Sequence, residues 1–408
     1  MDVSTSKKNI AAILIISALG YFVDIYDLIL FSIVRITSLK SLGAAEADLL
    51  PNGVLLLNMQ MGGMLIGGII WGILGDKKGR ISVLFGSIFI YSAANILNGF
   101  AHSIPEYAVL RFAAGLGLAG ELGAGITLVS EVMTKETRGY GTMIVATIGI
   151  LGAVVAALVG DFFEWRTAYF IGGGMGVALL IMRVGVYESG MYNSIKESNV
   201  LKGGFHKLFM NKKHFLKYLH CITIGVPIWF IVGVLITFSP EFAKAFGIKG
   251  TISTGTAVMC CYIGLAAGDL ASSALSQFFK SRKKIIGLFI ILEAVFIILY
   301  LFFNRFDATF FYAICGLLGL SGGYWAVFVT NAAEQFGVNI RATVTTTVPN
   351  FVRGAVVPAT LLFQYLTPVT GIVYSALIVG MSAIISAFIS MTKLEETFGK
   401  DLNYVEKH

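Results

Sequence analysis

The sequence predicts an all-α membrane protein in which twelve transmembrane helices form two pseudo-symmetric six-helix bundles. Three observations lead to this fold class: an apolar composition, twelve apolar stretches of spanning length, and loops that recur half a chain apart. Hydrophobic residues make up 56% of the 408 residues and charged residues only 13%, whereas a soluble domain carries about 25% charged residues. The composition therefore excludes a soluble enzyme, a nucleic-acid-binding module and a disordered scaffold.

Each predicted span is long and apolar enough to cross a bilayer as a helix, which takes about 20 residues. The first span is too long for the core of a signal peptide, and no small-residue cleavage site follows it. We therefore expect it to remain in the mature protein. The predicted spans are residues 10–37, 50–74, 81–101, 106–130, 139–160, 167–187, 215–240, 253–277, 284–303, 308–333, 342–366 and 369–392.

The connections between spans are short except for one polar, basic segment in the middle of the chain. This segment, residues 189–214, is predicted to be a cytoplasmic loop. It separates an N-terminal bundle, residues 1–188, from a C-terminal bundle, residues 215–393. Residues 394–408 are predicted to form a cytoplasmic tail.

Basic residues favour one side of the predicted topology. With both ends of the chain on the same side, 22 of the 30 Lys and Arg residues lie on that side and 6 on the other. Because cytoplasmic loops carry the excess of Lys and Arg, both termini are predicted to be cytoplasmic. The formal net charge of +7 is thus assigned to the membrane surface and not to a nucleic-acid partner. We expect a monomer, embedded in the lipid bilayer of a bacterial inner (plasma) membrane.

Two loops on the predicted cytoplasmic side recur along the chain. The loop from Glu131 to Arg138 follows the fourth span, and the loop from Glu334 to Arg341 follows the tenth; both read Glu, six residues, Arg, with an offset of 203. The basic turns after the second and eighth spans repeat with an offset of 202. The matched spacing indicates two homologous halves, a transporter design that places the substrate site between the halves.

The first of these basic turns carries a family resemblance. Residues 72–84, with Gly72, Asp76 and the Gly79-Arg80 pair, resemble the signature loop of the major facilitator superfamily. The resemblance implies the major facilitator fold and a secondary active transporter. The second copy of the turn, Ala274 to Arg282, lacks the Asp, which puts a gate built symmetrically from both halves in doubt.

Two further motifs resemble those of the metabolite:proton symporter and sugar-porter branches of the same superfamily. Arg111, followed by a glycine-rich run that ends in Gly120-Glu121, resembles the fourth-span motif. Asp24-Ile-Tyr26-Asp27 resembles the acidic motif of the first span. In these branches a first-span Asp and the fourth-span Arg are implicated in proton coupling, so the resemblance assigns that role to Asp27 and Arg111.

Ionisable side chains within the predicted spans need a partner or a function, because each costs at least about 2.5–3.5 kcal/mol at bilayer depth. Asp24 and Asp27 share one helix face, and two buried neighbouring carboxyl groups are not both comfortably ionised. One of them is therefore expected to take up and release a proton; the alternative is a static pair with Arg111. The predicted proton-coupling residues are Asp24, Asp27, Arg111 and Glu121, and Asp269, Glu293 and Arg353 complete the intramembrane set.

Arg353 is the candidate for binding a substrate anion, because a guanidinium group binds carboxylate in a two-pronged fork. Phosphate fits the same fork, and a structural pairing with Asp269 or Glu293 is the alternative. When the repeat offset is applied, the acid–base residues of the first half have no charged counterparts in the second half. The second half has aromatic residues instead, and we expect it to contribute most of the substrate contacts. Packing is the alternative role for Tyr324 and Trp325. The predicted substrate-binding residues are Arg353, Tyr324, Trp325, Trp229, Tyr26 and Asn350.

The loops on the cytoplasmic side predict a gate that closes the inner mouth. Asp76 is expected to bond to the amino end of another helix and to Arg138, and Arg80 to pair with Glu131. The alternative is a set of solvated charges, which explains the lysines but not the acidic members. The predicted gate residues are Gly72, Asp76, Gly79, Arg80, Glu131, Arg138, Glu334 and Arg341.

These patterns predict proton-coupled import of a small polar metabolite, expected to be an organic acid, and not an enzyme. The alternatives are a proton-antiport exporter of a drug or siderophore, or an importer of a carboxylate siderophore. The four cysteines lack metal-ligand spacing with His, so we expect no metal or cofactor. The expected partners are a small-molecule substrate, protons and lipid.

Overall fold

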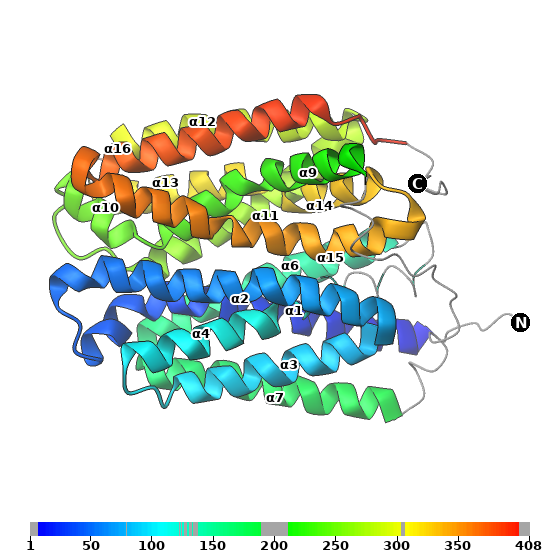
Figure 1. Cartoon of the computed structure of the whole chain (residues 1–408), viewed down its shortest axis with the longest axis horizontal. Coiled ribbons are helices and arrows are strands. Elements are labelled where there is room, and N and C mark those ends of the chain that lie inside the picture. Colours follow the sequence, from blue (N-terminus) through cyan, green and yellow to red (C-terminus); the bar gives the residue numbers. More distant parts are fainter. Residues whose placement is uncertain are drawn as a thin grey trace, which may run out of the picture.

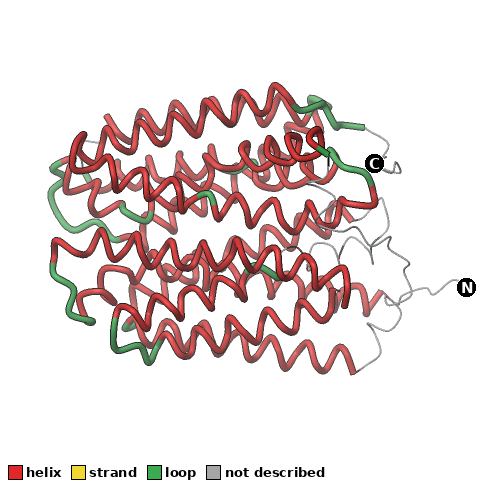
Figure 2. The backbone as a smooth tube through the Cα atoms, in the orientation of Figure 1, coloured by secondary structure: helices red, strands yellow, loops and turns green. Residues whose placement is uncertain are grey.

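The computed structural model of the chain is a bundle of helices that lie roughly along one direction (Figure 1). It describes residues 7–399 except 79, 122, 124, 126–128, 130–132, 134–137, 189–210 and 303–306; only the backbone is described for 7–9, 76–78, 80, 81, 138–140, 142, 143, 185–188 and 338–342. Figure 2 shows short loops between helices and no strand in the described residues. The helices are α1 (Lys7–Ser41), α2 (Leu49–Lys78), α3 (Arg80–Asn98), α4 (Ile104–Leu118), α6 (Arg138–Phe162), α7 (Trp165–Glu188), α9 (Lys212–Phe230), α10 (Ser239–Phe246), α11 (Thr254–Phe278), α12 (Arg282–Phe302), α13 (Ala308–Gly322), α14 (Trp325–Glu334), α15 (Val338–Gly354) and α16 (Val356–Lys393), with a 3₁₀ turn at Glu46–Asp48 and a π-helical turn at Ile231–Ile236.

The all-α prediction is confirmed for the described residues. Nine helical stretches among them are long and apolar enough to cross a membrane. The apolar part of α3, Ser82–Asn98, is shorter than that threshold, and the predicted fourth span continues beyond α4 into residues that are only partly described. The last two predicted spans merge into one stretch with a kink at Gly371. The count of twelve spans stays a prediction.

The helices pack as two groups that meet along one interface. In the first group α2 packs on α4 and α3 packs on α7; in the second, α11 packs on α13 and α12 packs on α16. The same pairs of spans therefore meet in both groups, as the repeat predicts. Figure 1 shows the first group below the second, and α2 against α15 and α6 against α11 join them. This repeated pairing supports the two-half organisation, whose predicted boundaries remain a proposal.

Glycines allow equivalent helices to approach closely in both groups. A Cβ atom at Gly67 of α2 would lie 2.5 Å from the carbonyl oxygen of Leu116 on α4. A Cβ atom at Gly268 of α11 would lie 2.1 Å from the carbonyl oxygen of Leu320 on α13. Contacts this short exclude any larger residue unless the backbones separate. Such small-residue contacts hold membrane helices together, where the hydrophobic effect provides no driving force between them.

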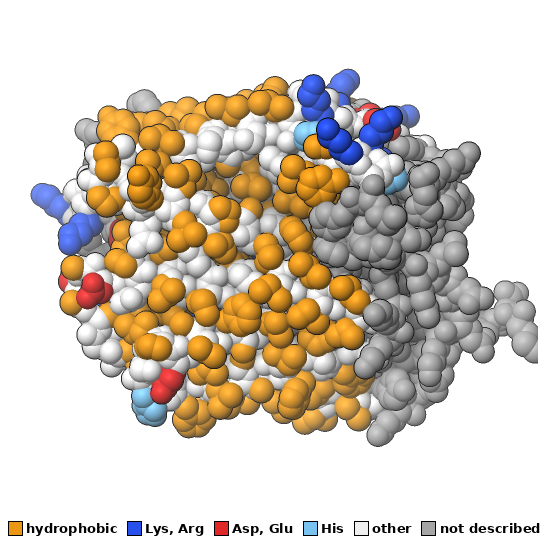
Figure 3. Space-filling model, in the orientation of Figure 1, with side chains coloured by type: hydrophobic (Ala, Val, Ile, Leu, Met, Phe, Trp, Pro, Cys, Tyr) orange, Lys and Arg blue, Asp and Glu red, His pale blue; other side chains and the backbone are white. Residues whose placement is uncertain are grey.

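Apolar side chains cover the outside of the bundle along its length. Figure 3 shows them over the visible face, with Lys and Arg gathered at the two ends. Phe89 and Ile181 of the first half and Ile263 and Ile385 of the second are each more than half exposed. A continuous apolar exterior of this kind is expected where lipid is the solvent.

Both ends of the helical part of the chain lie at one end of the bundle. The start of α1 and the end of α16 are on the right in Figure 1. We call this end the terminal face and the other the opposite face. The described lysines at the start of α9, in the turn before α12 and at the end of α16 lie on the terminal face. Which face contacts the cytoplasm stays a prediction.

A pair of neighbouring glycines in α2 tests the close packing of α2 and α4. Gly63→Ala is expected to destabilise the protein by about 1–3 kcal/mol, because the new Cβ atom would lie 2.2 Å from the backbone oxygen of Phe112. Gly62→Ala is the matched control, since no atom lies within 4 Å of its Cβ position. Thermal unfolding in detergent measures both, and equal midpoints for the two variants would contradict the packing.

Candidate functional site

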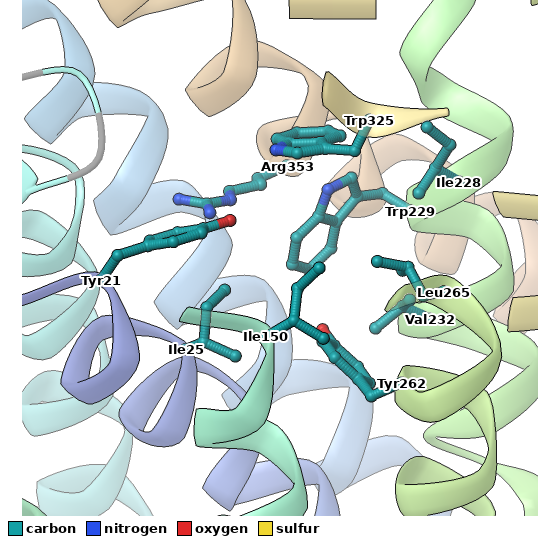
Figure 4. A pocket seen from close by; sticks show the side chains of 10 residues that line it. All are labelled: Tyr21, Ile25, Ile150, Ile228, Trp229, Val232, Tyr262, Leu265, Trp325 and Arg353. Atoms are coloured by element: carbon teal, nitrogen blue, oxygen red, sulfur yellow. The ribbon is translucent and has the colours of Figure 1, made fainter. Parts of the chain in front are cut away.

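A small cavity lies between the two halves, near the middle of the bundle. Its volume is about 30 Å³, which is room for roughly two water molecules. The first half contributes side chains from α1 and α6, and the second half contributes the rest (Figure 4). The lining residues are Tyr21, Ile25, Ile150, Ile228, Trp229, Val232, Tyr262, Leu265, Trp325 and Arg353.

Breaks in the helices of the second half shape the cavity. Pro227 lies inside α9, and the helix widens into the π-helical turn Ile231–Ile236 two residues after Trp229. The tenth predicted span is interrupted at Gly323 and Tyr324, so that α14 begins with Trp325. Irregular backbone of this kind occurs at membrane depth where it lies against protein or a cavity. The two tryptophans of the cavity therefore both stand at points where a regular helix stops.

Arg353, in the last turn of α15, is the cation of the cavity. Its side chain is fully buried, and its guanidinium carbon lies 5.4 Å from the ring centre of Trp229 and 5.8 Å from that of Trp325. None of its three side-chain nitrogens has a hydrogen-bond partner among the described residues. A buried guanidinium group without a close hydrogen bond can bind a planar anion in a two-pronged fork.

The negative charge nearest to Arg353 belongs to the other half of the protein. Asp24 Oδ2 on α1 lies 3.8 Å from Arg353 Nη2, and both side chains are buried. This distance is within ion-pair range but too long for a hydrogen bond. The predicted partners of Arg353, Asp269 and Glu293, do not lie within ion-pair distance of it. Arg353 and Asp24 therefore form an ion pair that crosses the interface between the halves.

Asp27 and Arg111 are both buried but are not in contact. Neither carboxylate oxygen of Asp27 accepts a hydrogen bond from the described residues. Arg111 Nη1 instead lies 3.4 Å from the Tyr169 hydroxyl, and its guanidinium group lies over the rings of Phe31 and Tyr169. The two charges stand apart in this conformation, and the predicted proton switch between them stays a prediction.

Glu121 has a partner that the sequence analysis missed. Arg183 of α7 donates to both of its carboxylate oxygens and to the carbonyl oxygen of Leu84, with both charged side chains only 1% exposed. Arg183 lies near the end of the predicted span 167–187, so the sequence analysis counted it with the basic residues of the following loop. A buried Glu121 at bilayer depth requires a cation, and this requirement could have pointed to Arg183 from the sequence alone.

The remaining predicted substrate residues divide into two groups. Trp229 and Trp325 line the cavity beside Arg353. Tyr26, whose hydroxyl donates to the carbonyl oxygen of Ala168, and Asn350, whose amide donates to that of Ala119, do not line it. Tyr324 also lies behind the cavity wall. The cavity adds Tyr21 and Tyr262, which the sequence analysis missed; Tyr21 stands one helical turn before Asp24, on the same face of α1.

The halves contact each other on both sides of the cavity. Toward the opposite face, Arg35 Nη2 of α1 lies 2.6 and 2.7 Å from the carboxylate oxygens of Glu241 on α10, and Thr237 donates to Ser32 at 2.9 Å. Toward the terminal face, Asn350 of α15 donates to Ala119 at 2.8 Å. Gly72 also approaches Thr347 there, where a Cβ atom would lie 3.4 Å from the Thr347 methyl carbon. The cavity thus lies between two sets of contacts.

Only part of the predicted gate lies within the described residues. Gly79 and Glu131, and the side chains of Asp76, Arg80, Arg138 and Arg341, lie outside them. Glu334 is described: Arg282 Nε lies 3.5 Å from its Oε2, and Thr397 donates to the same oxygen. By the repeat offsets, Arg282 and Glu334 are the counterparts of Arg80 and Glu131. The pairing expected in the first half therefore has an observed counterpart in the second.

A carboxylate from the end of the chain replaces the Asp that the second basic turn lacks. Glu396 accepts from the Ser281 hydroxyl and from the backbone N–H groups of Arg282, at 2.9 Å, and Lys283, at 3.2 Å. These groups form the amino end of α12, which favours a negative charge. The predicted tail is residues 394–408. Its first part, residues 394–399, is therefore bound to the second half through Glu396.

The charge state of Glu396 predicts a pH-dependent contribution to stability. Partial burial raises the pKa of Glu396. Hydrogen bonds from Ser281 and from the backbone of Phe398, Arg282 and Lys283 together lower the pKa by more than burial raises it, so the pKa lies below its ordinary value. A lowered pKa means that the stabilisation is present above about pH 4.3 and is lost as the pH falls through the pKa of the folded protein.

Glu396→Gln is therefore expected to lower the thermal midpoint at neutral pH and to have little effect in strong acid. The comparison of melting curves at both pH values measures this. Glu164→Gln removes the same charge from an exposed side chain that forms no hydrogen bond or ion pair with the described residues, and it serves as the control. An equal loss for Glu396→Gln at both pH values would contradict the assignment.

Comparison with known proteins agrees with the motifs. A family model described as the Major Facilitator Superfamily matches residues 17–357. A niacin transporter of Acinetobacter baylyi is 31% identical over 42% of this chain and 39% of its own length, so the chain spans well under half of that relative. A putative metabolite transport protein of Haemophilus influenzae is 26% identical over 86% of this chain and 89% of its own length. A gentisate transporter of Corynebacterium glutamicum is 25% identical over 65% and 62%.

Proposed function

The chain belongs to the major facilitator superfamily and is a multi-pass membrane protein, and we propose that it imports a small organic acid together with protons. The family model covers most of the chain, which confirms the resemblance of the signature loop. The observation that carries the proposal is the ion pair between Arg353 and Asp24, because it joins the guanidinium group that lines the cavity to a carboxyl group of the other half. The proposed mechanism is alternating access of this cavity to the two faces.

The substrate is an anion of the carboxylate class. The described residues form no close hydrogen bond with Arg353, and a carboxylate would accept two of its N–H groups in parallel. Asp24, at 3.8 Å, is too far from Arg353 to form a hydrogen bond with this fork. A bound carboxylate would complete it.

The rings around the fork favour a planar aromatic acid. Tyr21, Trp229, Tyr262 and Trp325 surround the cavity beside Arg353, and aromatic rings pack against one another in edge-to-face and offset geometries. Niacin and gentisate, the compounds named for two relatives, are both planar aromatic carboxylates. The present cavity has room for water only, so binding requires the halves to open.

In this proposal the substrate and Asp24 share one arginine, Arg353, and proton coupling follows from that sharing. When a carboxylate occupies Arg353, Asp24 loses its cation. A buried carboxylate without a cation is far less stable than the neutral acid, so Asp24 takes up a proton as the anion binds. One negative charge and one proton enter together, and the site keeps its net charge.

Asp27 and Arg111 would supply a second proton-carrying position, one helical turn from Asp24. Arg111 faces Tyr169 in this conformation, and a movement of α4 against α1 would bring it to Asp27 or take it away. The excess of Lys and Arg on the terminal face supports a cytoplasmic location for that face. Breaking the contact between Arg35 and Glu241 would then open the cavity to the outside, and separation of the predicted gate loops would open it to the cytoplasm.

Asp24→Asn tests the coupling in proteoliposomes that carry a pH gradient, with labelled nicotinate or benzoate as the probe. The wild type is expected to accumulate the probe, with an affinity that falls up to about tenfold per pH unit because one proton binds with each anion. The variant is expected to bind the probe without this pH dependence and to lose accumulation, while exchange persists. Asp27→Asn, measured in parallel, tests the second position. Accumulation by Asp24→Asn equal to that of the wild type would refute the shared arginine.

Arg353→Lys tests the substrate contact. A lysine keeps the charge but cannot form the two-pronged fork, so the KM for the probe is expected to rise at least about tenfold. Arg166→Lys is the matched control, because Arg166 also lies over a tryptophan, 4.1 Å from the ring centre of Trp165, but does not line the cavity. The same rise in both variants would contradict a direct contact of Arg353 with the substrate.

A further inference from the structure

The second half contains two buried carboxyl groups that the proposed transport cycle does not use. Asp269 on α11 and Glu293 on α12 both lie at the break between α13 and α14. Among the described residues, no cation lies within 4 Å of either carboxyl group. At this depth each group needs another means of stabilisation, and the two groups find different ones.

Asp269 is stabilised by the start of a helix. Its Oδ1 accepts the backbone N–H of Ala326 at 3.0 Å, in the first turn of α14. The amino end of a helix presents unpaired N–H donors and partial positive charge. An ionised carboxylate suits this position, and it fixes the point at which α14 begins.

Glu293 has no such donors. Among the described residues, its only hydrogen-bond partner is the Tyr324 hydroxyl oxygen, 3.2 Å from Oε2, and its Oε1 has none. The same hydroxyl oxygen lies 2.9 Å from the carbonyl oxygen of Ile224 on α9. A carbonyl oxygen only accepts, and a phenol has one proton to give. Once that proton lies toward Ile224, the contact with Glu293 is a hydrogen bond only if Glu293 is the donor.

We propose that Glu293 is protonated and uncharged, and that it acts as a neutral hydrogen-bond donor that positions Tyr324 and thereby Trp325. The carboxyl O–H of Glu293 donates to the Tyr324 oxygen, and the Tyr324 O–H donates to the carbonyl of Ile224. Tyr324 is thus held between α12 and α9.

The next residue, Trp325, lines the cavity, with its ring centre 6.4 Å from that of Trp229. Glu293 lies behind the cavity wall and determines the position of one aromatic side chain in it. It is a positioning residue and not a carrier of the coupled proton.

Infrared spectroscopy tests the charge state without any substrate. The spectrum of the wild type minus that of Glu293→Gln is expected to contain the carbonyl band of a protonated carboxyl group, and the band is expected to persist to about pH 9, far above the ordinary titration of Glu. The carboxylate bands of an ionised Glu in the same difference spectrum would overturn the proposal. This arm is independent of the proposed transport function.

Uptake of labelled nicotinate tests the positioning role, and this arm rests on the proposed function. Glu293→Gln keeps a donor, so its KM, kcat and pH profile are expected to stay within about twofold of the wild type. Tyr324→Phe loses both hydrogen bonds and is expected to raise the KM about three- to tenfold with little change in kcat.

Two outcomes would overturn the positioning role. Loss of accumulation in Glu293→Gln, as expected for Asp24→Asn, would make Glu293 a coupling residue. An unchanged KM in Tyr324→Phe would remove Tyr324 as the link to the cavity. If the wild type takes up no aromatic acid, the proposed function fails, and the infrared result still decides the charge state of Glu293.

Discussion

An ionised side chain is stable within the membrane only when an opposite charge or a set of hydrogen-bond donors accompanies it. This constraint determines how the buried arginines at the centre of the protein are paired. The cost of an unpaired charge in a medium of low polarity exceeds most other single contributions to folding. An arginine cannot avoid that cost by losing its proton. Arg183 meets the requirement with Glu121 inside the first half, whereas Arg353 meets it with Asp24 across the interface. Only the second kind of pair changes when the halves move.

The helical architecture could be predicted from the sequence because the bilayer leaves little choice. Backbone groups in lipid must be paired within their own segment, so an apolar stretch of spanning length indicates a helix, and a repeated loop indicates a repeated bundle. The same logic identified Arg353, Trp229 and Trp325, since a cation and helix breaks at mid-membrane depth need a reason. Tyr21 and Tyr262 were missed because an aromatic residue in an apolar span looks like packing until its neighbours are known.

Partner choice could not be predicted, because it depends on helix rotation and on contacts between distant segments. Arg35 and Arg183 both lie near the ends of predicted spans, where span boundaries are uncertain by about one helical turn. Both read as loop charges, yet both are buried and paired, with Glu241 and Glu121. The contact of Arg353 with Asp24 joins residues far apart in the sequence, and no spacing rule connects them. Composition locates buried charges, but only the fold assigns their partners.

An arginine shared between the halves also explains how a carrier of this kind would avoid leaks. Four occupancies of the cavity are available: empty, substrate alone, proton alone, and both. The empty cavity is neutral because Asp24 balances Arg353, and the fully loaded cavity is neutral because the substrate anion does so while Asp24 holds a proton. Either ligand alone leaves one uncompensated charge. Closing the halves around a charged cavity would carry the full cost of burying that charge. In the proposed cycle only the neutral occupancies would close, and proton and anion would cross the membrane together.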